Sequence, residues 1–130
     1  RVLAEAAAAA QAWMLQVSTD FVFSGHSVSP YTEDDPTGPL GVYGQSKRDG
    51  ELAVQQACAS SIIVRTAWLY GVHGNNFVKT MLRLMKERPE LGIVADQVGS
   101  PTWAAGLAAG QLVVVLILLL ATRRRRRSDA

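Results

Sequence analysis

The sequence predicts an α/β fold in which helices pack against a parallel sheet, and three observations indicate this class. Helix and strand patterns alternate along the chain, an order typical of parallel strands joined by right-handed crossovers. Residues 62–64 form a continuous β-branched run, as expected for a strand covered on both faces. Thr19 and the segment at 66–70 follow predicted strands, at the carboxyl ends beyond which ligands bind in such sheets. The length of 130 residues suits one domain.

The first half of the chain predicts a helix, a strand, a long loop and a second helix. Residues 2–12 are rich in alanine and favour a helix, and residues 13–17 form a short apolar strand. Residues 25–41 are rich in glycine, proline, serine and acidic side chains, which indicates a loop. Helical pattern then begins around Tyr43 and continues to about Ala59.

The second half predicts a strand at 62–64, a third helix and a last strand at 91–95. Asn75 or Asn76 can cap this helix, which ends before Pro89. Its apolar residues recur at helical spacing: Phe77, Met81, Leu84 and Met85.

Charge, cysteine and histidine content argue against several classes of function. Five of the thirteen basic residues lie at 123–127, so the rest of the chain is mildly acidic and presents no predicted nucleic-acid surface. Cys58 is the only cysteine, which excludes an internal disulfide, fits a cytoplasmic protein, and predicts a small buried side chain. His26 and His73 occupy loops without metal-ligand spacing, so no metal site is predicted.

Tyr43 and Lys47 form the most informative pair, because residues four apart share one helix face. A nearby ammonium favours the ionised form of a phenol. A phenol tuned in this way can exchange a proton with a carbonyl oxygen during hydride transfer. The hydroxyl of Thr19 could hydrogen-bond the same oxygen. The Tyr-x-x-x-Lys pattern alone arises by chance in about one in five chains of this size, so its context decides.

That context consists of six blocks between about Val17 and Leu107. They read STDFVFSG at 18–25, PYTEDDP at 30–36, VYGQSK at 42–47, RTAWLYG at 65–71, GNNFVK at 74–79 and DQVGSPTW at 96–103. In this order they resemble the extended short-chain dehydrogenase/reductases, specifically the dTDP-4-dehydrorhamnose reductase family. The resemblance implies a partial Rossmann-like doubly wound parallel sheet. It also implies a fragment of an NAD(P)H-dependent reductase that converts dTDP-4-dehydrorhamnose to dTDP-rhamnose.

The resemblance also implies roles for individual residues. Thr19, Tyr43 and Lys47 match the catalytic triad of the family. Tyr43 is then the general acid that protonates the C4 oxygen of the sugar as NADPH or NADH delivers hydride. Lys47 holds the nicotinamide ribose, and Thr19 positions the carbonyl. Arg65 falls at a position implied to contact the cofactor.

The implied substrate-binding residues are Thr19, Asp20, Phe21 and Trp68. Trp68 would offer a stacking surface to the deoxysugar, and a plain core position is the alternative. The family often carries tyrosine where Phe21 stands, so a hydroxyl contact is lost there, and a core position is again the alternative. The partners implied are a dTDP-4-keto-sugar and a second copy of the full-length protein in a homodimer.

The phosphate-binding part of such reductases is missing from the sequence. They begin with a strand, a glycine-rich turn and a helix that binds the pyrophosphate, and no such turn follows a strand here. The chain also begins with Arg1 rather than methionine, and it lacks the apolar region of a signal peptide. A fragment without the N-terminal βαβ half, inactive alone, is therefore expected. The alternative is a non-catalytic binding protein resembling the regulatory subunit of methionine adenosyltransferase.

Residues 1–107 are predicted to form the C-terminal part of a Rossmann-type reductase domain with the start of its substrate region. The family pattern ends at about Ala108, so residues 108–130 are predicted to form an unrelated tail. Residues 112–121 are strongly apolar, and the arginines at 123–127 follow almost directly. The preferred interpretation is a shifted reading frame or a mispredicted end. A membrane tail anchor and a buried helix are the alternatives, and contact with a membrane is expected only for a true anchor.

Overall fold

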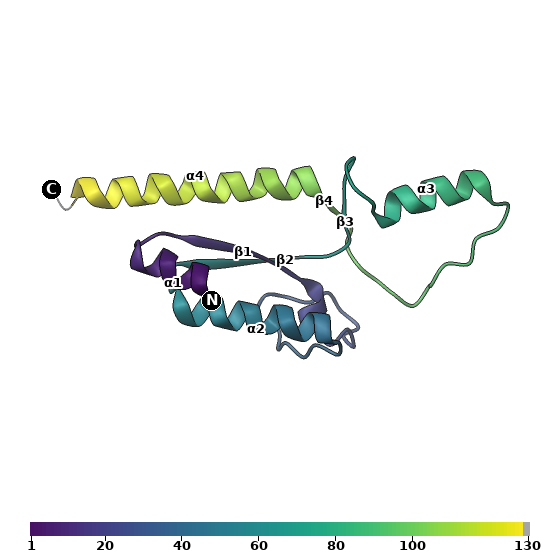
Figure 1. Ribbon diagram of the computed structural model, residues 1–130, viewed down its shortest axis with the longest axis horizontal. Coiled ribbons are helices and arrows are strands. Elements are labelled where there is room, and N and C mark those ends of the chain that lie inside the picture. The colour runs from purple at the N-terminus through teal and green to yellow at the C-terminus, as the bar shows by residue number, and fades with distance from the viewer. Residues whose placement is uncertain (129–130) are drawn as a thin grey trace. The chain divides into compact units, whose positions relative to one another are not determined.

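The computed structural model describes residues 1–128, with side chains described for residues 1–122 (Figure 1). The chain divides into two compact units, Arg1–Ala67 and Trp68–Ala130, which we call unit 1 and unit 2. Helices and parallel strands occur in both, so the predicted α/β class is confirmed.

Unit 1 contains a two-stranded parallel sheet and the helices that cover it. Its elements are α1 (Val2–Ala9), β1 (Met14–Thr19), a 3-10 turn η1 (Asp20–Val22), α2 (Val42–Ala57) and β2 (Ser61–Thr66). The two strands pair in register from Met14 with Ser61 to Thr19 with Thr66. Their carboxyl ends therefore lie together, and Thr19 is the last residue of β1.

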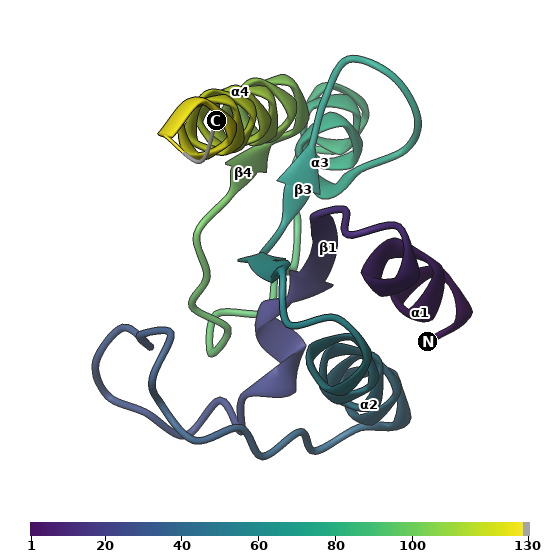
Figure 2. The ribbon, with the colours of Figure 1, turned by 90° about the vertical axis from the view of Figure 1, so that its left-hand side faces the viewer.

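The core of unit 1 lies between the two helices and one face of the sheet. Ala4 from α1 packs with Val54 from α2 and with Cys58, which confirms that this cysteine is a small buried residue. Met14 and Ile63 contact this cluster from the sheet. Figure 2 shows α1 and α2 on the same side of β1.

The second face of the sheet differs from the expectation. Side chains alternate between the faces of a strand, so Val17 points away from the side that carries Gln16 and Ser18. Val17 is 37% exposed, and every residue of β2 is only half-buried. Within unit 1, the β-branched run at 62–64 is thus covered by helices on one face rather than on two.

Unit 2 holds a short parallel strand pair and two helices. Its elements are β3 (Leu69–Tyr70), α3 (Phe77–Glu87), β4 (Thr102–Trp103) and α4 (Ala104–Ser128). Leu69 pairs with Thr102 and Tyr70 with Trp103. Asn76 caps α3, since its Oδ1 accepts a hydrogen bond from the Lys79 N–H at 3.1 Å, and α3 ends before Pro89 as predicted.

Two predicted elements need correction. Residues 91–95 were expected to form a strand but have no regular structure, because no neighbouring strand pairs with their backbone. The first helix ends at Ala9 instead of residue 12, because Gln11 adopts a left-handed φ of 52°. In unit 2, no residue of Ala104–Thr122 is buried, and the three interpretations of the tail stay predictions.

The tail forms one continuous helix in the described residues. The predicted boundary between residues 107 and 108 falls inside α4, which begins at Ala104. The side chains of the arginines at 123–127 lie outside the described part of the chain.

Candidate active site

The site begins with Thr19, whose side chain is fixed at the carboxyl end of β1. The residue is 6% exposed. Its Oγ1 accepts a hydrogen bond from the Phe21 N–H at 3.2 Å, which caps η1, and donates one to Asp20 Oδ1 at 3.1 Å. Because a hydroxyl has a single proton, Thr19 can donate to a substrate carbonyl only when that proton turns away from Asp20.

Tyr43 lies in the first turn of α2 and presents its ring to solvent, with 59% of the residue exposed. Its ring meets Phe21 edge to face, with centroids 5.9 Å apart and planes inclined at 75°. Such a T-shaped pair orients both rings while leaving their outer edges free. The phenol of Tyr43 is thus held beside the residue two positions after Thr19.

Gly44 explains why α2 can come so close to η1. It is buried, and an added Cβ would overlap the carbonyl oxygen of Phe21 and lie 2.9 Å from the Cβ of Pro39. Only a residue without a side chain allows this approach of two backbones.

Lys47 follows Tyr43 by one helical turn and reaches the other side of Thr19. Its Nζ donates a hydrogen bond to the carbonyl oxygen of Val17 at 3.2 Å. An ammonium has three donors, so two more remain for a ligand. Tyr43 and Lys47 therefore contact the residues two positions on either side of Thr19, and this brings all three predicted catalytic residues to one end of β1.

Two predicted substrate residues also lie at this end of the strand. Asp20 accepts a hydrogen bond from the Thr19 hydroxyl, and Phe21 is 60% exposed. The ring of Phe21 borders the exposed ring of Tyr43. The role of Phe21 in binding substrate stays a prediction.

Trp68 belongs to unit 2 and is only partly buried there. It adopts a left-handed φ of 44°, its exposed fraction is 39%, and its ring centroid lies 6.1 Å from that of Phe77. An added Cβ at Gly99 would lie 2.7 Å from the Trp68 ring, so the indole packs directly on that glycine. Its role in binding substrate stays a prediction.

Arg65 was expected to contact the cofactor, and its guanidinium is held by Glu51. The Arg65 Nε and Nη2 atoms donate to the two Glu51 carboxylate oxygens at 3.0 and 2.7 Å. Burial raises the pKa of Glu51, but the hydrogen bonds and charge of Arg65 outweigh it and hold this pKa below its ordinary value. The same hydrogen bonds raise the pKa of Arg65.

Glu51 is a site-supporting residue that sequence reasoning missed. It is 1% exposed and follows Lys47 by one more helical turn. The signal was the spacing Tyr43, Lys47, Glu51, which places a phenol, an ammonium and a carboxylate on one helix face. A buried carboxylate requires a partner, and only the fold reveals that the partner is Arg65.

Unit 2 contains an open cavity of about 260 Å³. Polar and aromatic side chains line it, among them Tyr70, His73, Asn75, Asn76 and Trp103. Within residues 1–128, no group of three or more His, Cys, Asp or Glu side chains could hold a metal ion.

Comparison with protein families matches residues 1–125 to the RmlD substrate binding domain. The dTDP-4-dehydrorhamnose reductase of Escherichia coli K12 is 52% identical over 106 residues, which cover 82% of this chain and 36% of that protein. The reductase of Streptomyces griseus is 52% identical over 109 residues, covering 83% of this chain and 36% of that protein. The chain thus spans about a third of the length of these relatives.

Solved structures agree with this relationship. A dTDP-4-dehydrorhamnose reductase from Clostridium acetobutylicum matches 87% of this chain and 40% of its own length, with a TM-score of 0.82 and 49% identity. A second, from Bacillus anthracis in complex with NADP, matches the same shares with a TM-score of 0.81 and 45% identity.

Proposed function

The chain belongs to the dTDP-4-dehydrorhamnose reductase family, and from that premise we propose that it is the proton-transfer segment of an NAD(P)H-dependent reductase of dTDP-4-dehydro-6-deoxy-sugars. The observation that carries the proposal is the arrangement around Thr19. Tyr43 contacts Phe21 and Lys47 contacts Val17, and these contacts beside Thr19 support the proposal.

In the proposed reaction, the reduced nicotinamide cofactor supplies a hydride to C4 of the keto-sugar. Tyr43 gives its phenolic proton to the C4 oxygen, so the carbonyl becomes a hydroxyl and the phenol becomes a phenolate. Lys47 stabilises that phenolate with its charge, and Thr19 orients the carbonyl oxygen by donating a hydrogen bond. Asp20 and Phe21 border the sugar.

The described residues can hold the nicotinamide ribose of the cofactor but not its pyrophosphate. Lys47 keeps two donors after its bond to Val17, enough to hold the hydroxyls of the nicotinamide ribose. No glycine-rich turn between a strand and a helix is present to cradle the pyrophosphate. The NADP bound to the Bacillus anthracis relative supports NADPH as the reductant.

The test is a chimera in which residues 1–107 replace the matching segment of the Escherichia coli reductase, which is 52% identical. NADPH oxidation with dTDP-4-dehydrorhamnose is followed by absorbance. Tyr43→Phe is expected to lower kcat by about 10²- to 10⁴-fold, the range for loss of a general acid. Lys47→Met should lower it too, while Lys86→Met on α3 serves as the matched control. Full activity of the Tyr43→Phe chimera would overturn the proposal.

A second candidate function is that of a non-catalytic binding protein like the methionine adenosyltransferase regulatory subunit. The retained Thr19, Tyr43 and Lys47 argue against it, because a binding protein has no need of an acid beside a carbonyl site. An inactive but folded chimera, together with a stable complex of this chain with a methionine adenosyltransferase, would favour it. Failure to recover such a complex would remove it.

A cytoplasmic location and a homodimer in the longer protein complete the proposal. The single cysteine, which is buried, fits a reducing compartment. The substrate proposed is a soluble nucleotide sugar, which also fits the cytoplasm.

Membrane insertion of α4 is a separate proposal. The segment Ala104–Thr122 has 19 residues, a mean hydropathy of 2.5 and no buried part. At 1.5 Å per residue it extends about 28 Å, close to the thickness of a bilayer core. The arginines at 123–127 follow it, and arginine-rich flanks stay in the cytoplasm. A spanning α4 would then place residues 1–103 on the opposite side, where a cytoplasmic reductase does not act.

Carbonate extraction of membranes from expressing cells distinguishes a cytoplasmic location from membrane insertion of α4. Release of the chain into the soluble fraction overturns membrane insertion. Retention supports it, provided that Leu116→Arg, which puts a charge at the middle of α4, restores release. Protection of unit 1 from added protease would then show which side it occupies.

A further inference from the structure

The Glu51–Arg65 pair joins the helix that carries Tyr43 and Lys47 to the end of β2. Glu51 lies on α2 with its side chain 1% exposed, and Arg65 lies on β2 with 23% exposed. Two parallel hydrogen bonds fix both the distance and the plane of the guanidinium, which a single contact does not. The register places Arg65 beside Ser18, the neighbour of Thr19.

The same guanidinium lies over an aromatic ring. Arg65 Cζ lies 4.9 Å from the centroid of Phe23, a cation–π distance. Phe23 in turn stacks on Tyr31, with centroids 4.4 Å apart and planes inclined by 6°. Arg65 therefore contacts both α2 and the segment that follows η1.

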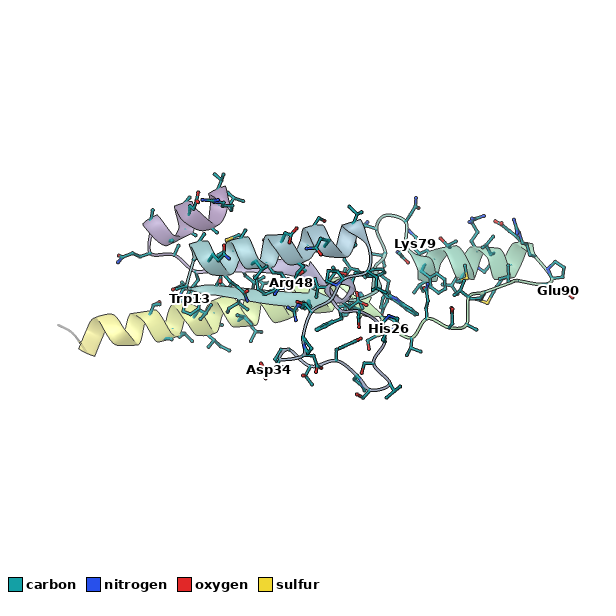
Figure 3. All side chains as sticks on the ribbon, turned by 90° about the horizontal axis from the view of Figure 1, so that it is seen from below. Trp13, His26, Asp34, Arg48, Lys79 and Glu90 are labelled. Carbon is teal, nitrogen blue, oxygen red and sulfur yellow. The ribbon has the colours of Figure 1, made fainter. Side chains whose placement is uncertain are left out.

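Tyr31 extends this chain of contacts into the long loop at 24–38. Its phenolic oxygen lies 3.3 Å from Ser24 Oγ and accepts the Ser27 N–H at 3.1 Å. These hydrogen bonds lower the pKa of Tyr31. The far end of the loop is tied to α2 as well, because Arg48 donates to Thr37 Oγ1; Figure 3 labels Arg48 on this helix.

We propose that Arg65 is a positioning residue that holds the 24–38 loop against the helix of Tyr43 and Lys47, and that it is not a ligand of the cofactor. The expected effect on catalysis rests on the proposed reductase function. The anchoring of the 24–38 loop by Arg65 does not depend on that function. The guanidinium is essential to it, since its two-pronged edge holds Glu51 while the same group lies over Phe23.

The rate of cleavage by chymotrypsin measures how often the 24–38 loop opens in the 130-residue chain. Chymotrypsin cleaves after aromatic residues, Tyr31 is the aromatic residue within this loop, and Phe23 stands directly before it. Arg65→Met is expected to raise the cleavage rate after Tyr31 at least about tenfold, since the loop opens more often once its anchor is lost. Arg65→Lys should restore little, because lysine keeps the charge and loses the planar fork. Arg83→Met, which breaks the exposed Arg83–Glu87 pair on α3, is the matched control and should leave the rate unchanged.

Phe23→Leu provides a second variant that leaves the Glu51–Arg65 pair in place, in case Arg65→Met does not fold. It should also raise cleavage after Tyr31, while far-UV circular dichroism stays that of the parent chain. An unchanged rate in Phe23→Leu, or full restoration by Arg65→Lys, would overturn the proposal.

Kinetics of the chimera separate positioning from cofactor binding. Arg65→Met is expected to lower kcat about tenfold or more with little change in KM for NADPH, because the proton donor is misplaced and the cofactor contacts persist. A raised KM for NADPH with unchanged kcat would instead assign Arg65 to the cofactor. An inactive parent chimera would count against the reductase function and leave the proteolysis result to decide on the loop.

Discussion

The backbone of Gly44 packs against the carbonyl of Phe21 so closely that a side chain at this glycine would overlap the carbonyl oxygen. This contact sets the first turn of α2, and with it Tyr43, on the turn that follows Thr19. The position of the acid thus depends on a residue that has no chemistry of its own.

Gly44→Ala is expected to destabilise unit 1 by about 1–3 kcal/mol, the usual cost of overpacking. The backbone of Phe21 is not the end of a flexible side chain and has little freedom to move aside. Urea unfolding measures the change. Gly50→Ala on the same helix is the matched control, because nothing lies within 4 Å of a Cβ there. It should stabilise by about 0.5–1 kcal/mol, since alanine favours helix more than glycine.

The free energy of unfolding should decrease as the pH is lowered, because Glu51 becomes protonated. The pKa of this carboxyl lies below its ordinary value of 4.5, so its stabilising effect is complete above that value. The effect is lost as pH falls through the folded-state pKa, where the protonated group no longer pairs with Arg65. Urea unfolding at pH 7, 5, 4 and 3 would follow this loss.

Glu51→Gln is the variant that isolates this carboxylate. At pH 7 it should lower the free energy of unfolding by about 1–3 kcal/mol, less than for a fully buried pair because Arg65 is partly exposed. The difference from the parent should shrink as pH falls below 4. A difference that stays constant from pH 7 to pH 3 would contradict the assignment.

In unit 2, Asn76→Ala should lower the stability of α3 by about 0.5–2 kcal/mol, the range for loss of an N-cap. The asparagine oxygen accepts the Lys79 N–H at 3.1 Å, and its amide donates to the Gly71 carbonyl at 2.8 Å. Hydrogen exchange at the Lys79 amide should be faster in the variant. Asn75→Ala offers a neighbouring control with the same change in composition, and equal exchange rates in both variants would contradict the cap.

The sequence predicted the parts of the site whose signals are local. Tyr43 and Lys47 share a face because helical spacing dictates it, and Thr19 ends a strand because the apolar run stops there. The cap at Asn76 is local too. Each depends on neighbours within a few residues.

Features that depend on distant partners were not predicted from the sequence. Glu51 and Arg65 are 14 residues apart, and neither spacing nor composition pairs them. The strands β3 and β4 have two residues each, too short for an alternating pattern to be seen. Residues 91–95 have an apolar pattern like a strand but no pairing partner, and pairing is what makes a strand.

The hydroxyl of Thr19 has two tasks, and Thr19→Ser and Thr19→Val test the two together. It caps η1 through the Phe21 N–H, and it is the predicted donor to the substrate carbonyl. Thr19→Ser keeps both and should hold kcat/KM of the chimera within a few-fold. Thr19→Val removes both and should lower kcat by about 10²- to 10³-fold, the usual effect of losing one such donor.

Asp20→Asn identifies which task matters to the rate. The Asp20 carboxylate accepts a hydrogen bond from the Thr19 hydroxyl, with 3.1 Å between the two oxygens. It therefore competes with the substrate carbonyl for this hydrogen bond. A neutral amide is a weaker acceptor than a carboxylate, so the proton becomes more available to the substrate. We expect the Thr19→Val loss in kcat to persist in the Asp20→Asn background, while Asp20→Asn alone retains the cap. If Thr19→Val loses stability but keeps its kcat, Thr19 acts through the cap alone.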